Sequence, residues 1–278
     1  MFATATLAKR IERAEKGLIV EAARSSGHRL PPGQMLIEEF AGAAAVYVEP
    51  GAPFNKVAGA GFDGAPAVEI LDSIERQYAE RGSPVQFEVS SLGDPVVVRT
   101  LTTRGYELVG FENVLGLAID RRSPMQHPDE VHISRADPGD ADVWLDTVVT
   151  GFLHADVFDG PPSHETISRD VLEPIFRDMA ATPSFERYLA RRGDSVAGAA
   201  SLRIEDGVAQ LAGAATLPQH RRRGVQTALL AHRLAEAAAR GCDVAVVTTQ
   251  PGSKSQENVQ RAGFSLLYTR AILVKPSR

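Results

Sequence analysis

The sequence predicts a mixed α/β fold (an α+β mixed sheet) made of two tandem units of the same kind. Stretches with helical spacing of apolar residues alternate along the chain with short apolar stretches typical of strands. A polar segment with two prolines, residues 121–130, interrupts this alternation and is typical of a linker. The 278 residues are also enough for two domains of ordinary size.

The ends of the two halves follow one pattern: helix, glycine, strand, helix, glycine with an aromatic residue, strand. Gly82 corresponds to Gly241, and Gly105 to Gly263, at a spacing of about 159 residues. Because two landmarks agree in spacing, we interpret the halves as a duplication, with domains at residues 1–122 and 131–278. The alternative is a chance recurrence of helix–glycine–strand patterns, which are common in α/β proteins.

The first half is expected to contain its clearest helix at residues 66–81. Leu71, Ile74 and Tyr78 stand there in helical spacing, and Gly82 ends the helix as a glycine after the C-cap does. Residues 84–89 alternate between apolar and polar side chains, which is typical of a strand. The remaining expected elements are helices at residues 7–25 and 94–103 and strands at residues 34–39, 43–48, 56–59 and 105–115.

The second half is expected to begin with a strand at residues 131–135 and a helix at residues 137–152. Asp137 caps that helix and Pro138 occupies its first turn. A long apolar helix at residues 226–240 ends at Gly241. The other expected elements are a loop at residues 153–164, helices at 165–181 and 255–261, and strands at 184–191, 195–204, 208–216, 243–249 and 263–274.

Composition excludes several classes of function. The net charge of −5 argues against a general binder of nucleic acid or anionic membranes, because such proteins need a basic face. The single cysteine, Cys242, excludes an intramolecular disulfide and a zinc site built from cysteines. No stretch of about 18 apolar residues occurs, so we expect no transmembrane helix and a cytoplasmic location. A monomer and a homodimer both stay open.

The most informative segment joins a strand to the long helix and has three arginines before a glycine. A helix N-terminus offers backbone N–H groups without intrahelical partners, and the helix dipole adds partial positive charge. Arginine forks suit phosphate oxygens, and a glycine lets the backbone approach a ligand. The segment predicts a pyrophosphate site, with a solvated basic loop as the alternative. The site residues are Arg221, Arg222, Arg223, Gly224, Val225, Gln226 and Thr227.

These residues carry a resemblance to a known family. The segment Arg221-Arg-Arg-Gly-Val-Gln226 is similar to the Gln/Arg-x-x-Gly-x-Gly/Ala acyl-CoA signature of the GNAT (Gcn5-related N-acetyltransferase) superfamily. Gly263-Phe264 downstream is similar to the family's Gly-Phe segment. One departure is Gln226, where the family has glycine or alanine. The resemblance covers residues 131–274, and the first half looks like a degenerate copy, as in bacterial tandem-GNAT proteins.

The resemblance implies an N-acetyltransferase that moves an acetyl group from acetyl-CoA to a primary amine, with a small-molecule amine as the expected acceptor. In this family the strand before the signature pairs with pantetheine through its backbone, which points to Ala214, Ala215 and Thr216. The strand at residues 243–249 would form the other side of the cofactor site. Further candidate contacts are Ser253, Ser255 and Asn258, although Asn258 is equally typical of a capping or surface residue.

The sequence defines the catalytic groups less well. The strand at residues 208–216 carries no carboxylate, and Val259 stands where the family usually has a tyrosine. Tyr268 is the substitute candidate for the acid, although a tyrosine in a closing strand is more often a core residue. Glu205 is the candidate base, acting through water, with Asp206 and Glu257 as alternatives.

The acceptor pocket is expected among the first helices and loops of the second half. Its candidate residues are Trp144, Phe152, His154, Asp156, Phe158, Asp159 and His164. Trp144 is more typical of a core residue, an ordinary surface loop is the alternative for the others, and the spacing matches no metal-ligand pattern.

The first half lacks the pyrophosphate signature. Its corresponding loop at residues 59–66 has glycines and Asp63 but no basic residue, so we expect no CoA binding there. We expect this half to complete the acceptor cleft or to support the catalytic half. The rival functions are a non-catalytic acyl-CoA sensor or partner-binding module, and an enzyme that acylates protein amines.

Overall fold

The computed structural model describes residues 1–119, 130–154 and 168–277. Most of the predicted linker therefore lies outside the described residues. The first half contains α1 (Ala5–Ser26), β1 (Leu36–Phe40), β2 (Ala43–Tyr47), β3 (Lys56–Ala58), α2 (Val68–Glu80), β4 (Val85–Ser90), α3 (Pro95–Thr103) and β5 (Glu107–Ala118).

The second half repeats this order after one extra strand and helix, with the short β10 as a further extra strand. It contains β6 (His132–Arg135), α4 (Ala141–Leu153), α5 (Arg169–Ala180), β7 (Phe185–Arg192), β8 (Ser195–Glu205), β9 (Val208–Gln210), β10 (Ala215–Thr216), α6 (Val225–Ala239), β11 (Val244–Thr249), α7 (Lys254–Arg261) and β12 (Ser265–Lys275). Short 3₁₀ turns, η1 (Pro138–Asp140) and η2 (Pro218–His220), precede α4 and α6. The predicted α/β class is confirmed, and α2, β4, α3 and β5 recur as α6, β11, α7 and β12.

One predicted strand is wrong in detail. Residues 208–216 were expected as a single strand, but residues 211–214 are irregular and separate β9 from β10. The run Leu211-Ala-Gly-Ala-Ala215 is apolar, so its composition is that of a buried strand. Gly213 has φ of +58°, in the left-handed region that glycine adopts without strain, and this ends the extended pairing.

The strands form one mixed sheet in which the two halves are interleaved. The order is β1-β2-β3-β4-β12-β5-β11-β9-β8-β7-β6, with β10 paired to β8. β5 closes the first half, yet it lies between β12 and β11 and pairs with β11 from Asn113 opposite Thr249 to Ala118 opposite Val244. β12 closes the second half, yet it lies between β4 and β5. Each half therefore receives its closing strand from the other.

The domain bounds at residues 1–122 and 131–278 stay a prediction about the sequence. In the fold, strands of one half pair with strands of the other. β12 pairs with β4 from Arg270 opposite Ser90 to Lys275 opposite Val85. These antiparallel ladders satisfy the backbone groups of strands that would otherwise be edges.

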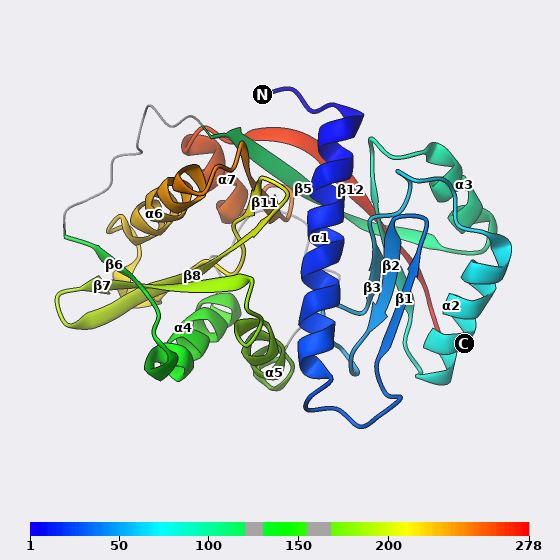
Figure 1. Cartoon of the computed structure of the whole chain (residues 1–278), viewed down its shortest axis with the longest axis horizontal. Helices are drawn as coiled ribbons and strands as arrows, with labels where there is room; N and C mark the ends of the chain where they lie inside the picture. Colours follow the sequence, from blue (N-terminus) through cyan, green and yellow to red (C-terminus); the bar gives the residue numbers. More distant parts are fainter. Residues whose placement is uncertain (120–129, 155–167, 278) are drawn as a thin grey trace.

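Helices cover both faces of the sheet. α1, α4 and α5 share one core, to which Leu18, Trp144 and Phe176 belong. α2 and α3 pack on the other face over the first half, and α6 and α7 over the second. α1 lies across the middle of the molecule, where Ile11 meets strands from both halves (Figure 1). Within the described ranges, no helix is long and apolar enough to cross a bilayer.

Candidate functional site

The break between β9 and β10 opens the sheet beside β11. Leu211 donates the last backbone hydrogen bond across to β11, to the Val246 carbonyl at 3.0 Å. One residue later the chain has turned to β8, because the Ala212 carbonyl accepts from the Ser201 backbone at 3.1 Å and from the Ser201 hydroxyl at 2.8 Å. Beyond Val246, β11 pairs with β5 alone among the described strands.

A buried arginine of α6 holds this turn in place. Arg233 Nη1 donates to the Ser201 carbonyl at 3.0 Å and approaches the Ala212 carbonyl at 3.5 Å. Burial lowers the pKa of Arg233 to about 10. A charged group at such depth needs hydrogen-bond partners, and the carbonyls released by the strand break supply them.

The divergence leaves backbone donors without backbone partners. Among the residues that the structure describes, the N–H groups of Ala212, Gly213 and Ala214 donate no backbone hydrogen bond. Unpaired N–H groups at a strand break can bind a carbonyl or an oxyanion. This is a donor set of the kind that acyl transfer requires.

The predicted anion loop lies at the start of α6. Gly224 is the N-cap residue, with φ of 74° and no side-chain cap, so the first-turn N–H groups of the helix lack a side-chain acceptor. Arg222 and Arg223 are exposed, and Arg222 has φ of 59°. Arg221 instead donates to the His154 carbonyl at the end of α4. Two of the three arginines therefore extend into solvent beside the helix N-terminus.

Small residues bring three elements together at this point. A side chain at Gly198 would meet the Ala215 carbonyl at 2.7 Å and Val225 Cγ1 at 2.8 Å. A side chain at Gly151, on α4, would collide with the Ala215 methyl group. The small side chain predicted to suit a ligand at Ala215 thus also serves close packing of β10 against α4, and the exposed Ala214 has no such role.

The unusual Gln226 of the anion loop has a defined partner. Asn258 Nδ2 on α7 donates to Gln226 Oε1 at 2.7 Å. Ser253 caps α7, accepting from the Gln256 N–H at 3.2 Å. Asn258 therefore lies close to the anion loop, whereas the hydroxyl of Ser253 is already used by its own helix. Ser255 and Thr227 are exposed or half-buried at the same end of the fold.

Three of the predicted acceptor residues lie in the described part of the chain. Trp144 is fully buried and donates to the Ala200 carbonyl at 3.1 Å, so it is a core residue. Phe152 is 46% exposed and its ring lies 5.3 Å from that of Phe176. His154 ends α4. Asp156, Phe158, Asp159 and His164 lie outside the described residues. Within the described ranges no group of side chains could hold a metal ion.

The two candidate catalytic residues each have a charged partner side chain. The Tyr268 hydroxyl is buried under α1 and donates to Glu12 Oε1 at 2.7 Å. Burial and the Glu12 carboxylate raise the pKa of Tyr268 well above its ordinary value. Glu205 is at the end of β8 remote from Gly198, opposite Val208, and forms an ion pair with Arg203 at 2.5 Å.

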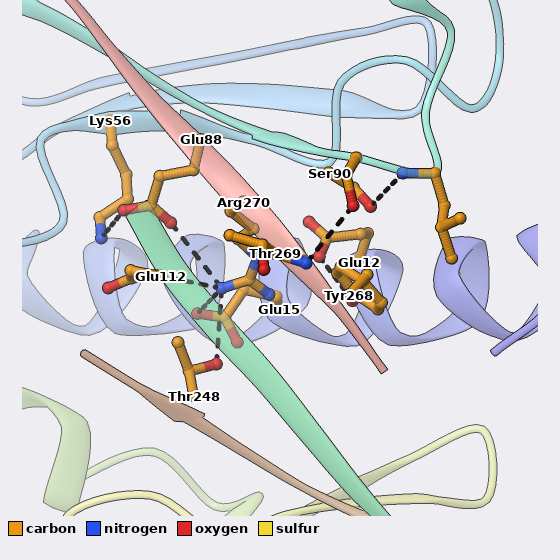
Figure 2. A network of polar contacts seen from close by, with 12 residues as sticks. Glu12, Glu15, Lys56, Glu88, Ser90, Glu112, Thr248, Tyr268, Thr269 and Arg270 are labelled. Carbon is orange, nitrogen blue, oxygen red and sulfur yellow. Dashed lines mark hydrogen bonds and ion pairs between the residues drawn. The ribbon is translucent and has the colours of Figure 1, made fainter. Parts of the chain in front are cut away.

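Sequence reasoning missed a polar network beneath α1, at the strands that the two halves exchange (Figure 2). Its centre is Arg270 on β12, which is 1% exposed. Arg270 contacts four carboxylates: Glu12 at 2.8 Å, Glu112 at 3.5 Å, Glu15 at 3.8 Å and Glu88 at 3.9 Å. Lys56 on β3 pairs with Glu88 at 2.5 Å. The sequence signal that could have revealed this network is the presence of charged residues within strands that are otherwise apolar.

The network reaches the open edge of β11. Arg270 Nη1 lies 3.5 Å from the hydroxyl of Thr248, an exposed residue that stands beyond the last bond to β9 (Figure 2). Glu112 is 29% exposed, whereas Glu12 and Glu88 are each 2% exposed. The network is thus sealed at its centre and accessible at Glu112.

The charges set the proton affinities of the carboxylates. Burial and the neighbouring Glu88 raise the pKa of Glu112 to about 7, against the opposing effect of Lys56 and Arg270. Burial also raises the pKa of Glu12, although Arg270 opposes it. Burial acts in the same sense on Glu88, but Lys56 and Arg270 hold the pKa of Glu88 below its ordinary value.

Part of the second half matches a known family model. Residues 150–264 match the model of the Acetyltransferase (GNAT) family. No curated protein matches the chain.

Solved structures share the fold of nearly the whole chain. A GCN5-related N-acetyltransferase from Kribbella flavida is 16% identical, with a TM-score of 0.63 over 94% of this chain and 95% of that one. A GCN5-related N-acetyltransferase from Sphaerobacter thermophilus is 16% identical, with a TM-score of 0.59 over 95% and 92%. A tandem GNAT protein from the clavulanic acid biosynthesis pathway is 12% identical, with a TM-score of 0.57 over 96% and 95%.

Proposed function

We propose that this protein transfers an acetyl group from acetyl-CoA to the primary amine of a small molecule, because residues 150–264 match the model of the Acetyltransferase (GNAT) family and solved GNAT structures share the fold of nearly the whole chain. The observation that carries the proposal is the divergence of the strands at Leu211 and Val246, directly beside the uncapped start of α6.

The residues at this divergence fit acetyl-CoA. The first-turn N–H groups at residues 224–227 and the exposed Arg222 and Arg223 suit the pyrophosphate. The pantetheine arm would follow the backbone at residues 214–216, with Asn258 and Ser253 at the far side of the anion loop. These contacts are part of the proposal.

The chemistry follows from the free backbone donors. The amine nitrogen attacks the thioester carbonyl carbon, and negative charge develops on the carbonyl oxygen. The N–H groups of Ala212, Gly213 and Ala214 are available to hydrogen-bond that oxygen. The carbon–sulfur bond then breaks, the thiolate leaves, and the acetylated amine is released.

Titration with acetyl-CoA and a turnover assay test the proposal. We expect calorimetry to show acetyl-CoA binding that the double variant Arg223→Glu with Gly224→Trp abolishes. Arg76→Glu, at an exposed arginine of α2, is the matched control and should bind as the parent does. Release of free CoA thiol in the presence of a panel of small amines measures turnover. Absence of acetyl-CoA binding to the parent protein would sink the proposal.

A second candidate function is a non-catalytic acyl-CoA sensor. Val259, at the position of the family's usual tyrosine, is a buried core residue, and Tyr268 donates to Glu12 instead of facing the strand break. This function would be favoured if the protein binds acetyl-CoA but releases no CoA thiol, either with the panel of small amines or with added protein amines.

A further inference from the structure

We propose that Glu112, on the closing strand of the first half, is the general base that takes the proton from the acceptor's ammonium group in the second half. This inference rests on the proposed acetyl transfer. It gives the first half a chemical role in a reaction whose acyl donor is held by the second half.

Strand exchange places Glu112 at the site. β5 lies directly beside β11, with Asn113 opposite Thr249 and Val114 opposite Thr248. Residues two apart on a strand share a face, so Glu112 shares the face of Val114 and Thr248. Arg270 Nη1 confirms this, because it lies 3.5 Å from both Glu112 Oε2 and the Thr248 hydroxyl.

This face is the one covered by α1, α4 and α5. Val114 packs with Ile11 of α1, and α4 packs against β10 on the far side of the strand break. An amine that approaches the open edge of β11 from this face meets Glu112 before the sealed carboxylates. Glu112 has the exposure that a proton acceptor needs, whereas Glu12 and Glu88 do not.

The charges around Glu112 favour a cationic acceptor. The groups that face it are Glu12 and Glu15 from α1, Lys56 from β3, Glu88 from β4 and Arg270 from β12. With Glu112 these are four carboxylates against two cations, so an ammonium ion offsets excess negative charge.

The network also has unused hydrogen-bonding capacity. Glu88 Oε2 and Arg270 Nη2 are buried, and each has no hydrogen-bond partner among the described residues. Buried polar atoms are normally paired in a purely structural network. The two atoms leave hydrogen-bonding capacity beside Glu112 that the described side chains do not use.

The proton affinity of Glu112 suits the role. A pKa of about 7 lets the carboxylate be ionised near neutral pH while still accepting a proton effectively. Proton transfer from R–NH₃⁺ to Glu112 leaves R–NH₂, whose nitrogen forms the new bond to the acetyl carbon. The second nitrogen proton leaves with the CoA thiolate or to solvent, and Glu112 returns its proton to water.

Glu112→Gln and its matched control test the inference in the full-length protein. Glu107→Gln changes an exposed glutamate on the same strand and should leave turnover unchanged. For Glu112→Gln we expect kcat/KM to fall about 100-fold or more. Its dissociation constant for acetyl-CoA, measured by calorimetry, should stay within about twofold of the parent value.

The pH profile separates catalysis from a structural role. In the parent protein log kcat/KM should rise with pH up to about 7, and Glu112→Gln should lose that rise. Turnover by Glu112→Gln at the parent rate and with the same pH profile would overturn the inference and leave the acetyl transfer standing. Acetyl-CoA binding by the parent without turnover of any amine would instead overturn the acetyl transfer, and the inference with it.

Discussion

Arg270 and Glu12 form a buried ion pair, with 2.8 Å between Arg270 Nε and Glu12 Oε1, that ties β12 to α1 across 258 residues of sequence. Both side chains are almost completely withdrawn from solvent. The charges of Glu12 and Glu15 hold the pKa of Arg270 above its ordinary value despite its burial. The exchanged strands connect the two halves through backbone hydrogen bonds, and this ion pair connects them through side chains.

Removal of Arg270 should therefore destabilise the whole molecule. Arg270→Met leaves buried carboxylates without their cation, which costs about 3–5 kcal/mol of unfolding free energy. Urea unfolding followed by circular dichroism measures it. Adding Glu12→Gln should restore part of the loss, because it removes one of the uncompensated charges. An unchanged urea midpoint for Arg270→Met would contradict this account of the pair.

Arg233 should control the opening of the sheet more than its stability. Arg233→Met removes the donor that holds the Ser201 and Ala212 carbonyls, so residues 211–214 are free to pair with β11. We expect the dissociation constant for acetyl-CoA to rise about tenfold, which is a loss of about 1.4 kcal/mol of binding free energy. Calorimetry measures it, with the exposed Arg99→Met as control. Equal affinities would show that the strand break does not depend on Arg233.

Asn258 should keep Gln226 away from the anion loop. Without the 2.7 Å hydrogen bond, the Gln226 amide is free to accept from the first-turn N–H groups of α6 and to compete with a phosphate. Asn258→Ala should weaken acetyl-CoA binding by about 1 kcal/mol, the value of a typical hydrogen bond. Asn258→Ala with Gln226→Ala should bind acetyl-CoA more tightly than Asn258→Ala alone, because the competing Gln226 amide is gone. Equal affinities of the single and double variants would show that Gln226 does not compete with the phosphate.

Glu112 should make stability depend on pH. Its pKa is raised from 4.5 to about 7 in the folded chain, so the folded state binds the proton more tightly than the unfolded state. The stability that this proton contributes is present below about pH 4.5 and is lost as pH rises through 7.

Comparison with Glu112→Gln isolates that contribution. The variant should match the parent at pH 5 and exceed it by about 1–3 kcal/mol at pH 8. Urea unfolding at both pH values measures the difference, and Glu107→Gln should follow the parent at each. A constant difference between Glu112→Gln and the parent would show that Glu112 keeps an ordinary pKa in the folded state.

The sequence predicted the elements well because helical and strand periodicities are local. The caps at Gly82 and Gly241 follow helices in both halves, and the recurring order of elements matches the predicted repeat. The break at residues 211–214 escaped prediction because its apolar run looks like a strand, and the contact of Ala212 with Arg233, 21 residues away, has no local sign in the sequence.

The exchange of closing strands was beyond local reasoning. β5 and β12 have similar apolar patterns, so the sequence of neither strand indicates which strands it pairs with. Glu112 was consequently not singled out within the predicted strand at residues 105–115, although the fold places that strand beside β11. Glu205, the candidate base acting through water, lies at the end of β8 remote from Gly198.

The interleaved sheet also orders events during synthesis. β4 is made well before β12, so Ser90 and its neighbours wait for their partner until residue 270 has left the ribosome. Until then the nascent first half exposes an unpaired strand edge, which is a site for mispairing with other chains. Pairing over so many intervening residues is slow in comparison with local hairpins. We therefore expect the two halves to acquire their native structure together, at the end of translation, and not one after the other.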